Sequence, residues 1–307
     1  MLSKQTLILR VCFLCTTCLT TLTAFAQNTL EFVQDGVNNS YSPPVPKGPT
    51  SIPQTLSFFL NSNGSKDEGI YFQKSQTPVS VTFSFDDQTY ITVPQHVTGM
   101  TFGAASGASS SQVRSVPVVN NQFFEDSTRS IFTSHPKGES GRGVNVYNNV
   151  GVQVFLSAKP LLTANAPTTD TSRYYYGKLR VHFSRPVNNP VISVMGLGAT
   201  TNFSGKRLGF ATELELQSPG RTLIKLSGSK ELVLDDNKTK ILHTKSSITG
   251  NCGNGAACGS LMVTGSDVTS LVFGVYLRTD GGPGVWGTEK VANSGDMWHI
   301  TITLPEQ

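Results

Sequence analysis

Two glutamates, Glu213 and Glu215, are the residues whose types and spacing come closest to catalytic chemistry. They belong to the alternating sequence Thr-Glu-Leu-Glu-Leu at 212–216, which predicts a β-strand with both carboxylates on one face. Two carboxylates about 5 Å apart on the concave face of a jelly roll can act as the acid and the nucleophile of a glycoside hydrolase. The same pattern also fits a strand whose polar face is solvated, so both interpretations stay open.

Other catalytic motifs find little support in the sequence. The chain has five histidines, and they are scattered singly: His96, His135, His182, His243 and His299. Neither a His-Glu-x-x-His motif nor a Gly-x-Ser-x-Gly elbow is present. The sequence therefore predicts no zinc site and no serine-hydrolase site.

Calcium is the one cofactor that the acidic residues could hold. Asp235 and Asp236 precede Asn237, and Asp280 precedes a Gly-Gly pair, so all three carboxylates fall in predicted turns. Carboxylate oxygens at loop tips are ligands that Ca²⁺ prefers. Aspartates also favour turns because they accept hydrogen bonds from their own backbone, and this alternative stays open.

A glycine-rich loop at 278–287 is the most suggestive binding feature. It contains one of only two tryptophans, Trp286, together with Arg278 and Asp280. An indole at a loop tip offers an apolar face for a sugar or a peptide and an N–H donor beside it. We therefore expect these three residues to bind ligand, unless Trp286 folds back over the core. Trp298, just before the last predicted strand, is expected in the core.

The N-terminus has the features of a cleaved signal peptide. Lys4 and Arg10 flank the start of an apolar run over 11–24, and Ala24-Phe25-Ala26 provides a small-x-small cleavage site. The run is too short to span a bilayer. Residues 1–26 are thus predicted to be removed, so that the mature protein begins near Gln27 and acts in the periplasm, at the cell surface or outside the cell.

Cysteine usage agrees with export. Three cysteines lie in the predicted signal peptide, which leaves Cys252 and Cys258 in the mature chain. Two cysteines six positions apart in an exported protein predict one small disulfide loop.

The charge composition limits the classes of partner that the protein is expected to bind. The chain of 307 residues has 24 Lys and Arg against 20 Asp and Glu, and two of those cations lie in the predicted signal peptide. This charge balance is too weak to indicate a nucleic acid or an anionic membrane as partner. No membrane span is expected.

Alternating apolar residues predict an all-β protein. The alternation occurs at 79–85, 179–183, 210–216 and 300–304, while 271–277 is more continuously apolar and is expected to be a central strand covered on both faces. No long helical pattern occurs. We predict a large antiparallel β-sandwich of jelly-roll or lectin type with long loops and few short helices. It would form one domain over 27–307 with an extended Pro-rich stretch at 27–53, or leave 27–110 as a subdomain.

Several segments resemble one adhesin family. They are Tyr174 to Leu179, Phe183 to Pro190, Gly196 to Gly198, Phe210 to Leu214 and Leu226 to Gly228. Residues 130–305 are similar to the lectin-like, non-repetitive ligand-binding domain of CshA-type bacterial surface adhesins. The resemblance implies a large β-sandwich, a host matrix protein or glycan as ligand, and no catalysis. It transfers no ligand-contacting residue.

Three functions follow as hypotheses. The first is a secreted, non-catalytic, adhesin-like protein that binds an extracellular polysaccharide or matrix protein. The second is a jelly-roll glycoside hydrolase that uses Glu213 and Glu215. The third is a structural surface protein that assembles with itself through its strand edges.

Overall fold

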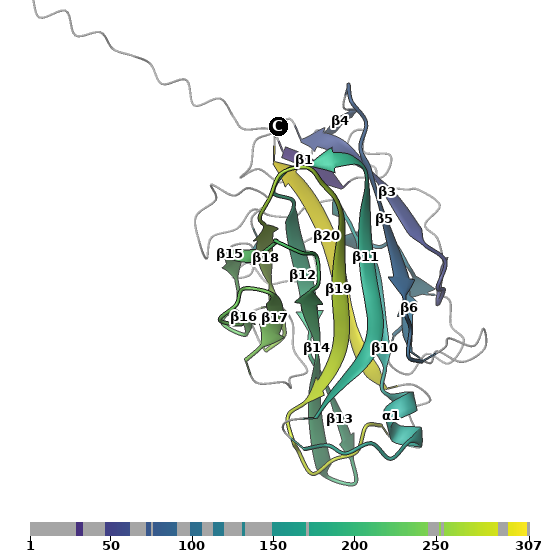
Figure 1. Cartoon of the computed structure of the whole chain (residues 1–307). Helices are drawn as coiled ribbons and strands as arrows, with labels where there is room; N and C mark the ends of the chain where they lie inside the picture. The colour runs from purple at the N-terminus through teal and green to yellow at the C-terminus, as the bar shows by residue number, and fades with distance from the viewer. Residues whose placement is uncertain are drawn as a thin grey trace, which may run out of the picture.

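Two antiparallel sheets dominate the protein (Figure 1). The computed structural model describes residues 29–32, 47–61, 72–74, 76–90, 99–105, 113–119, 131–132, 149–169, 172–244, 252, 255–287 and 294–305. The predicted all-β sandwich is confirmed. The predicted signal peptide lies outside the described residues, and the single-domain organisation stays a prediction.

The strands form two layers. The first sheet contains, in spatial order, β15 (Leu223–Gly228), β18 (Ala257–Val263), β12 (Val191–Leu197), β20 (Gly295–Pro305), β1 (Thr29–Phe32) and β3 (Gln54–Asn61), with β10 (Val152–Ser157), β6 (Met100–Phe102) and β4 (Phe72–Lys74) attached. The second continues from β3 through β5 (Ser80–Asp86), β11 (Arg173–Val187), β19 (Val268–Thr279), β14 (Lys206–Leu216), β17 (Lys240–His243) and β16 (Leu232–Leu234), with β13 (Ala199–Phe203) beside β14.

The remaining elements are short. The strand β2 (Lys47–Gly48) pairs with β7 (Val113–Arg114), and β8 (Val118–Val119) pairs with β9 (Asn149–Val150). One helix, α1 (Lys159–Thr163), is present in the described part of the chain, in line with the expectation of few short helices.

Strand β3 joins the two sheets along one side of the sandwich. Its first half pairs with β5, whereas from Phe58 onward it pairs with β1. On the opposite side, the strand path ends at β15 in one sheet and at β16 in the other. These two end strands contact each other, and Figure 1 shows them together on the left of the molecule.

The core lies between the sheets and follows the predicted alternation. One face of each long strand is buried, as Phe83 of β5, Val181 of β11, Phe273 of β19 and Ile302 of β20 illustrate with no exposed surface. Strand β19 lies between β11 and β14, which confirms its central position. The face of β19 that points away from the core is only half-buried. The expectation that both faces of this strand are covered was therefore too strong.

One carboxylate lies inside the apolar layer and ties the two sheets together. Asp296 of β20 accepts backbone hydrogen bonds from Gly198 at 3.1 Å and from Thr212 of β14 at 2.7 Å. Burial disfavours the charged form and raises the pKa of Asp296 from 3.8 to about 6, although these donors oppose the shift. Because the folded pKa exceeds the unfolded value, the fold loses stability as pH rises from about 4 to 6.

A partly buried histidine on the same strand has the opposite pH dependence. His299 lies 3.2 Å from the side-chain oxygen of Gln153 on β10. Burial lowers the pKa of His299 from 6.5 to about 4. A histidine that must stay neutral when folded stabilises the protein above its unfolded pKa, and this contribution is lost as pH falls from 6.5 to 4. The pH dependences of Asp296 and His299 therefore offset each other over this range.

Single substitutions should separate the two titrations. Relative to wild type, the unfolding free energy of His299→Gln should fall by about 3 kcal/mol as pH rises from 4 to 6.5, because the compensating histidine is gone. That of Asp296→Asn should rise by about 2 kcal/mol between pH 4 and 6. Urea denaturation across this range measures both. Curves of unfolding free energy against pH that run parallel to the wild-type curve would contradict the pKa shifts assigned to Asp296 and His299.

Candidate functional site

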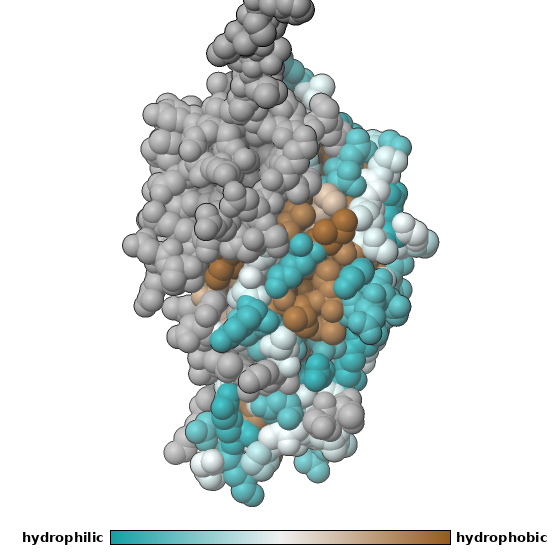
Figure 2. All heavy atoms as spheres, turned by 90° about the vertical axis from the view of Figure 1, so that its left-hand side faces the viewer, coloured by the Kyte–Doolittle hydropathy of each residue, from teal (hydrophilic) through white to brown (hydrophobic). Residues whose placement is uncertain are grey.

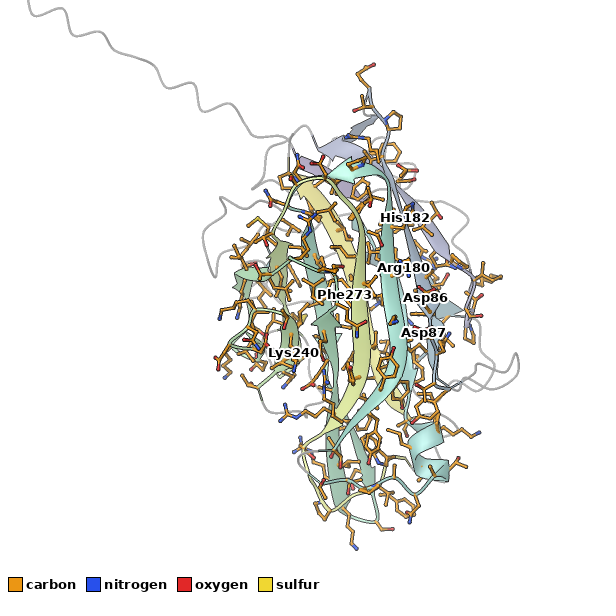
Figure 3. All side chains as sticks on the ribbon, viewed as in Figure 1. Asp86, Asp87, Arg180, His182, Lys240 and Phe273 are labelled. Atoms are coloured by element: carbon orange, nitrogen blue, oxygen red, sulfur yellow. A yellow bond between two sulfur atoms is a disulfide. The ribbon has the colours of Figure 1, made fainter. Side chains whose placement is uncertain are left out.

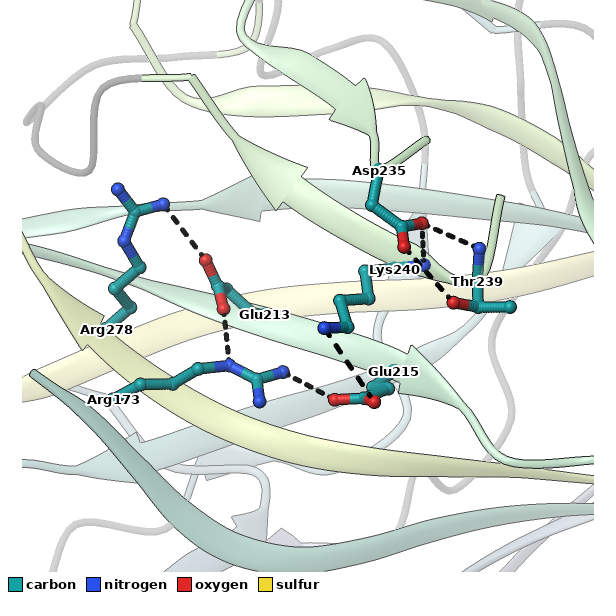
Figure 4. A network of polar contacts seen from close by, with 7 residues as sticks. All are labelled: Arg173, Glu213, Glu215, Asp235, Thr239, Lys240 and Arg278. Carbon is teal, nitrogen blue, oxygen red and sulfur yellow. Dashed lines mark hydrogen bonds and ion pairs between the residues drawn. The ribbon is translucent and has the colours of Figure 1, made fainter. Parts of the chain in front are cut away.

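The two candidate catalytic glutamates are held in a network of ion pairs on the outer face of the second sheet (Figure 4). Arg173 of β11 lies between them: its Nε donates to Glu213 at 2.7 Å and its Nη2 donates to Glu215 at 2.8 Å. Arg278 of β19 approaches the other oxygen of Glu213 at 3.2 Å, and Lys240 of β17 lies 4.0 Å from Glu215. We call these five residues the outer-face network.

Register explains why the network forms. Glu213 of β14 lies opposite Tyr276 of β19, and Tyr276 lies opposite Tyr175 of β11. The guanidinium of Arg173 therefore packs over the Tyr276 ring, 3.4 Å from its centroid, as a cation–π contact. Burial alone lowers the pKa of Arg173, but its hydrogen bonds to the two glutamates outweigh burial and raise it.

This geometry favours a structural role for the glutamates. The expectation that Glu213 and Glu215 share a face is confirmed, since one guanidinium binds both. Glu213 has only 5% of its side chain exposed and is bound by two arginines. These ion pairs join β14 to the neighbouring strands β11, β19 and β17. The glycoside hydrolase interpretation stays a prediction.

Further ion pairs continue along the same face. Arg180 of β11 donates to Asp86 of β5 at 2.7 Å, and Lys178 binds Asp87. Figure 3 shows Arg180 and His182 along β11, with Asp86 and Asp87 at the end of β5. Basic and acidic side chains alternate here, so this face has no strong field of one sign.

The structure corrects the expectation for Trp286. Its indole is 1% exposed and donates from Nε1 to the carbonyl of Ala166 at 2.9 Å. The ring packs against Tyr174 and Phe210, with centroids 5.4 and 5.8 Å away. Trp286 thus caps the core, the alternative that the sequence left open, and offers no free face to a ligand. Trp298 is fully buried, as expected.

The aspartates of the predicted turns are engaged by backbone donors. Asp280 accepts from Gly209 at 3.0 Å and from Gly282 at 2.9 Å, and thereby fastens the 280–287 loop to β14. Asp235 accepts from the N–H groups of Thr239 and Lys240 at 2.7 Å. Burial raises the pKa of Asp235, but these donors outweigh it and the pKa is lowered.

Calcium finds no additional support. Asp236 is exposed beside this turn. Among the described residues, no group of three or more His, Cys, Asp or Glu side chains could hold a metal ion. Calcium at Asp235, Asp236 or Asp280 stays a prediction.

The predicted disulfide between Cys252 and Cys258 is present. Both cysteines are buried in a small cluster with Met195, Ile131 and Phe132, away from the main core. Trp286 belongs to the main core cluster. The disulfide and the indole therefore lie in separate clusters.

An apolar groove that was not expected from the sequence opens where the two sheets end. It has a volume of about 410 Å³ and is lined by Leu223, Ile224, Lys225, Leu232, Val233, Leu234 and Lys238. We call it the edge groove. Figure 2 faces this side and shows an apolar area crossed by hydrophilic side chains. The sequence gives one signal of the groove: the segments 223–224 and 232–234 carry apolar residues at adjacent positions. An exposed edge strand normally avoids this pattern.

The fold and these sites define a β-sandwich with a salt-bridged outer face and an apolar groove at its edge. Comparisons with protein-family models, with curated proteins and with solved structures found no match. Within the described residues, no helix is long and apolar enough to cross a membrane.

Removing Arg173 should test the structural role of the outer-face network. Arg173→Ala should lower the unfolding free energy by about 1–3 kcal/mol, because Glu213 stays buried with one cation fewer. Chemical denaturation measures the loss. Lys178→Ala, which removes a cation from an exposed pair on the same strand, is the matched control and should leave the midpoint unchanged. Equal effects of the two substitutions would contradict this role.

Truncating Trp286 should destabilise the protein whether or not a ligand is present. Trp286→Ala should cost about 3–5 kcal/mol through the cavity that it leaves in the core. Trp286→Phe keeps most of the ring contacts but loses the N–H donor to Ala166, so its loss should be smaller. Thermal unfolding of both variants measures which substitution causes the larger loss of stability. A Trp286→Ala protein as stable as wild type would contradict the capping role.

Proposed function

We propose that the chain is a secreted, non-catalytic binding protein, adhesin-like, whose ligand is an extracellular matrix protein or polysaccharide. The observation that carries this proposal is the edge groove, an apolar concave surface at the end of both sheets. Exposed apolar surface of this kind marks interaction sites in folded proteins. Since Trp286 is buried, the described loop aromatic that could stack on a sugar is withdrawn from the surface, which favours a protein ligand over a glycan.

Export supports the proposal. The N-terminal segment has the pattern of a signal peptide. The disulfide between Cys252 and Cys258 is typical of oxidising compartments outside the cytoplasm. The sequence resemblance to a CshA-type ligand-binding domain implies the same class of function.

The absence of catalysis is part of the proposal. Glu213 and Glu215 are engaged by Arg173, Arg278 and Lys240, and none of these residues lines the edge groove. The carboxylates then serve the stability of the sheet, and binding takes place elsewhere.

Binding of the purified mature protein, residues 27–307, to an array of matrix proteins and polysaccharides tests the proposal. We expect at least one matrix protein to be retained, and Glu213→Gln to retain it equally, because the network lies outside the groove. Release of reducing sugar from any arrayed polysaccharide, lost in Glu213→Gln, would instead support the hydrolase. Retention of no arrayed molecule, together with concentration-dependent self-association in sedimentation, would favour the self-assembling structural protein.

A further inference from the structure

We propose that the edge groove binds an extended protein segment in which apolar and acidic side chains alternate. This inference rests on the proposed function and assigns it a surface and a ligand chemistry. Three features carry it: the shape and apolarity of the groove, its position between two terminal strands, and two lysines that have no carboxylate partner among the described residues.

The groove has a buried apolar floor and an exposed apolar rim. Leu223 of β15 and Leu232 of β16 are 1% and 0% exposed and form the floor. Ile224 is 45% exposed, and Val233 and Leu234 are half-buried. An occupant that covers these side chains would remove apolar surface from water at about 25 cal/mol per Å². The groove therefore favours an apolar ligand face.

The position of the groove favours an extended segment. Strand β15 pairs with β18 and β16 pairs with β17, and these two strands stand at the ends of the sheet path. A backbone hydrogen bond of 2.7 Å from Leu223 to the carbonyl of Lys238 connects the two ends. Terminal strands are the edges to which an extended peptide adds by backbone hydrogen bonding, with side-chain pockets that set its sequence.

Lys225 places a positive charge inside the groove. Its Nζ donates to the carbonyls of Ser229 at 2.9 Å and Leu232 at 2.7 Å. An ammonium group has three donors, so this arrangement leaves one for a ligand. Burial lowers the pKa of Lys225, although the nearby charge of Glu231 opposes the shift. A carboxylate from a ligand would offset this burial cost.

Lys238 adds a second cation at the rim. It is exposed and held on the turn after β16 by its backbone bond to Asp235. In the part of the chain that the structure describes, no carboxylate lies within ion-pair distance of Lys225 or Lys238. Glu231, the nearest acidic group to Lys225 along the chain, is paired with Lys230 at 3.9 Å. Two such cations beside apolar walls favour a ligand with acidic side chains between apolar ones.

Two synthetic ten-residue peptides test the chemistry directly on the mature protein. One alternates valine with glutamate and the other alternates valine with lysine, and both carry a fluorophore. We expect the acidic peptide to bind at least about tenfold more tightly, with an affinity that falls as salt is added. Ile224→Glu and Lys238→Glu should each weaken its binding by about tenfold or more.

Matched controls separate the groove from general charge and apolarity. Ile52→Glu changes an isolated isoleucine that is 69% exposed, and Lys206→Glu changes an exposed lysine on the β13–β14 hairpin. Both should bind the acidic peptide as wild type does. All four substitutions are at exposed positions, so circular dichroism should show the same fold throughout.

The outcomes are distinct. Equal binding of the two peptides, or unchanged binding by Ile224→Glu, would overturn the assignment. If Ile224→Glu still retains the matrix protein that wild type retains, the groove assignment fails while the proposed function stands. If wild type retains no matrix protein but binds the acidic peptide through the groove, the proposed function fails and the assignment stands. A dimer that Ile224→Glu dissociates, with no peptide bound, would assign the groove to a second copy of this chain and overturn the peptide.

Discussion

Every long strand must give one face to the apolar layer between the sheets, and the rest of the structure depends on this constraint. Because side chains alternate along a strand, the face opposite Phe273, Val181 or Ile302 must carry the polar residues. The layer admits few polar groups, and Asp296 lies in it with backbone donors from Gly198, between β12 and β13, and from Thr212 of β14. Burial raises the pKa of Asp296 to about 6 and lowers that of His299 to about 4, so the pH dependences of the two groups are opposite over this range.

The same constraint gives the charged residues of the second sheet their role. Glutamates that alternate with core leucines reach the outer face, where neighbouring strands supply Arg173, Arg278 and Lys240. Arg173 satisfies two carboxylates and a tyrosine ring at once. The two glutamates thereby become part of an ion-pair network on the outer face of the sheet.

Among the described strands, the two sheets are joined on one side of the sandwich but not on the side of β15 and β16. Strand β3 carries the chain from one sheet into the other, so that side is continuous. On the other side β15 and β16 meet without a ladder between them among the described strands. The apolar residues of two terminal strands then face a groove rather than a neighbour. This accounts for the exposure of Ile224, 45% of whose surface is open to solvent.

The sequence by itself determined the fold class, the alternation of the core strands, the disulfide between Cys252 and Cys258, and the common face of Glu213 and Glu215, because each depends on local spacing. Only the tertiary structure decided what those residues do. The partners of Glu213, on β11 and β19, lie 40 and 65 positions away along the chain. The burial of Trp286 depends on Ala166, 120 positions away, and the edge groove arises from two strand ends. Long-range packing sets such contacts, and no local pattern encodes them.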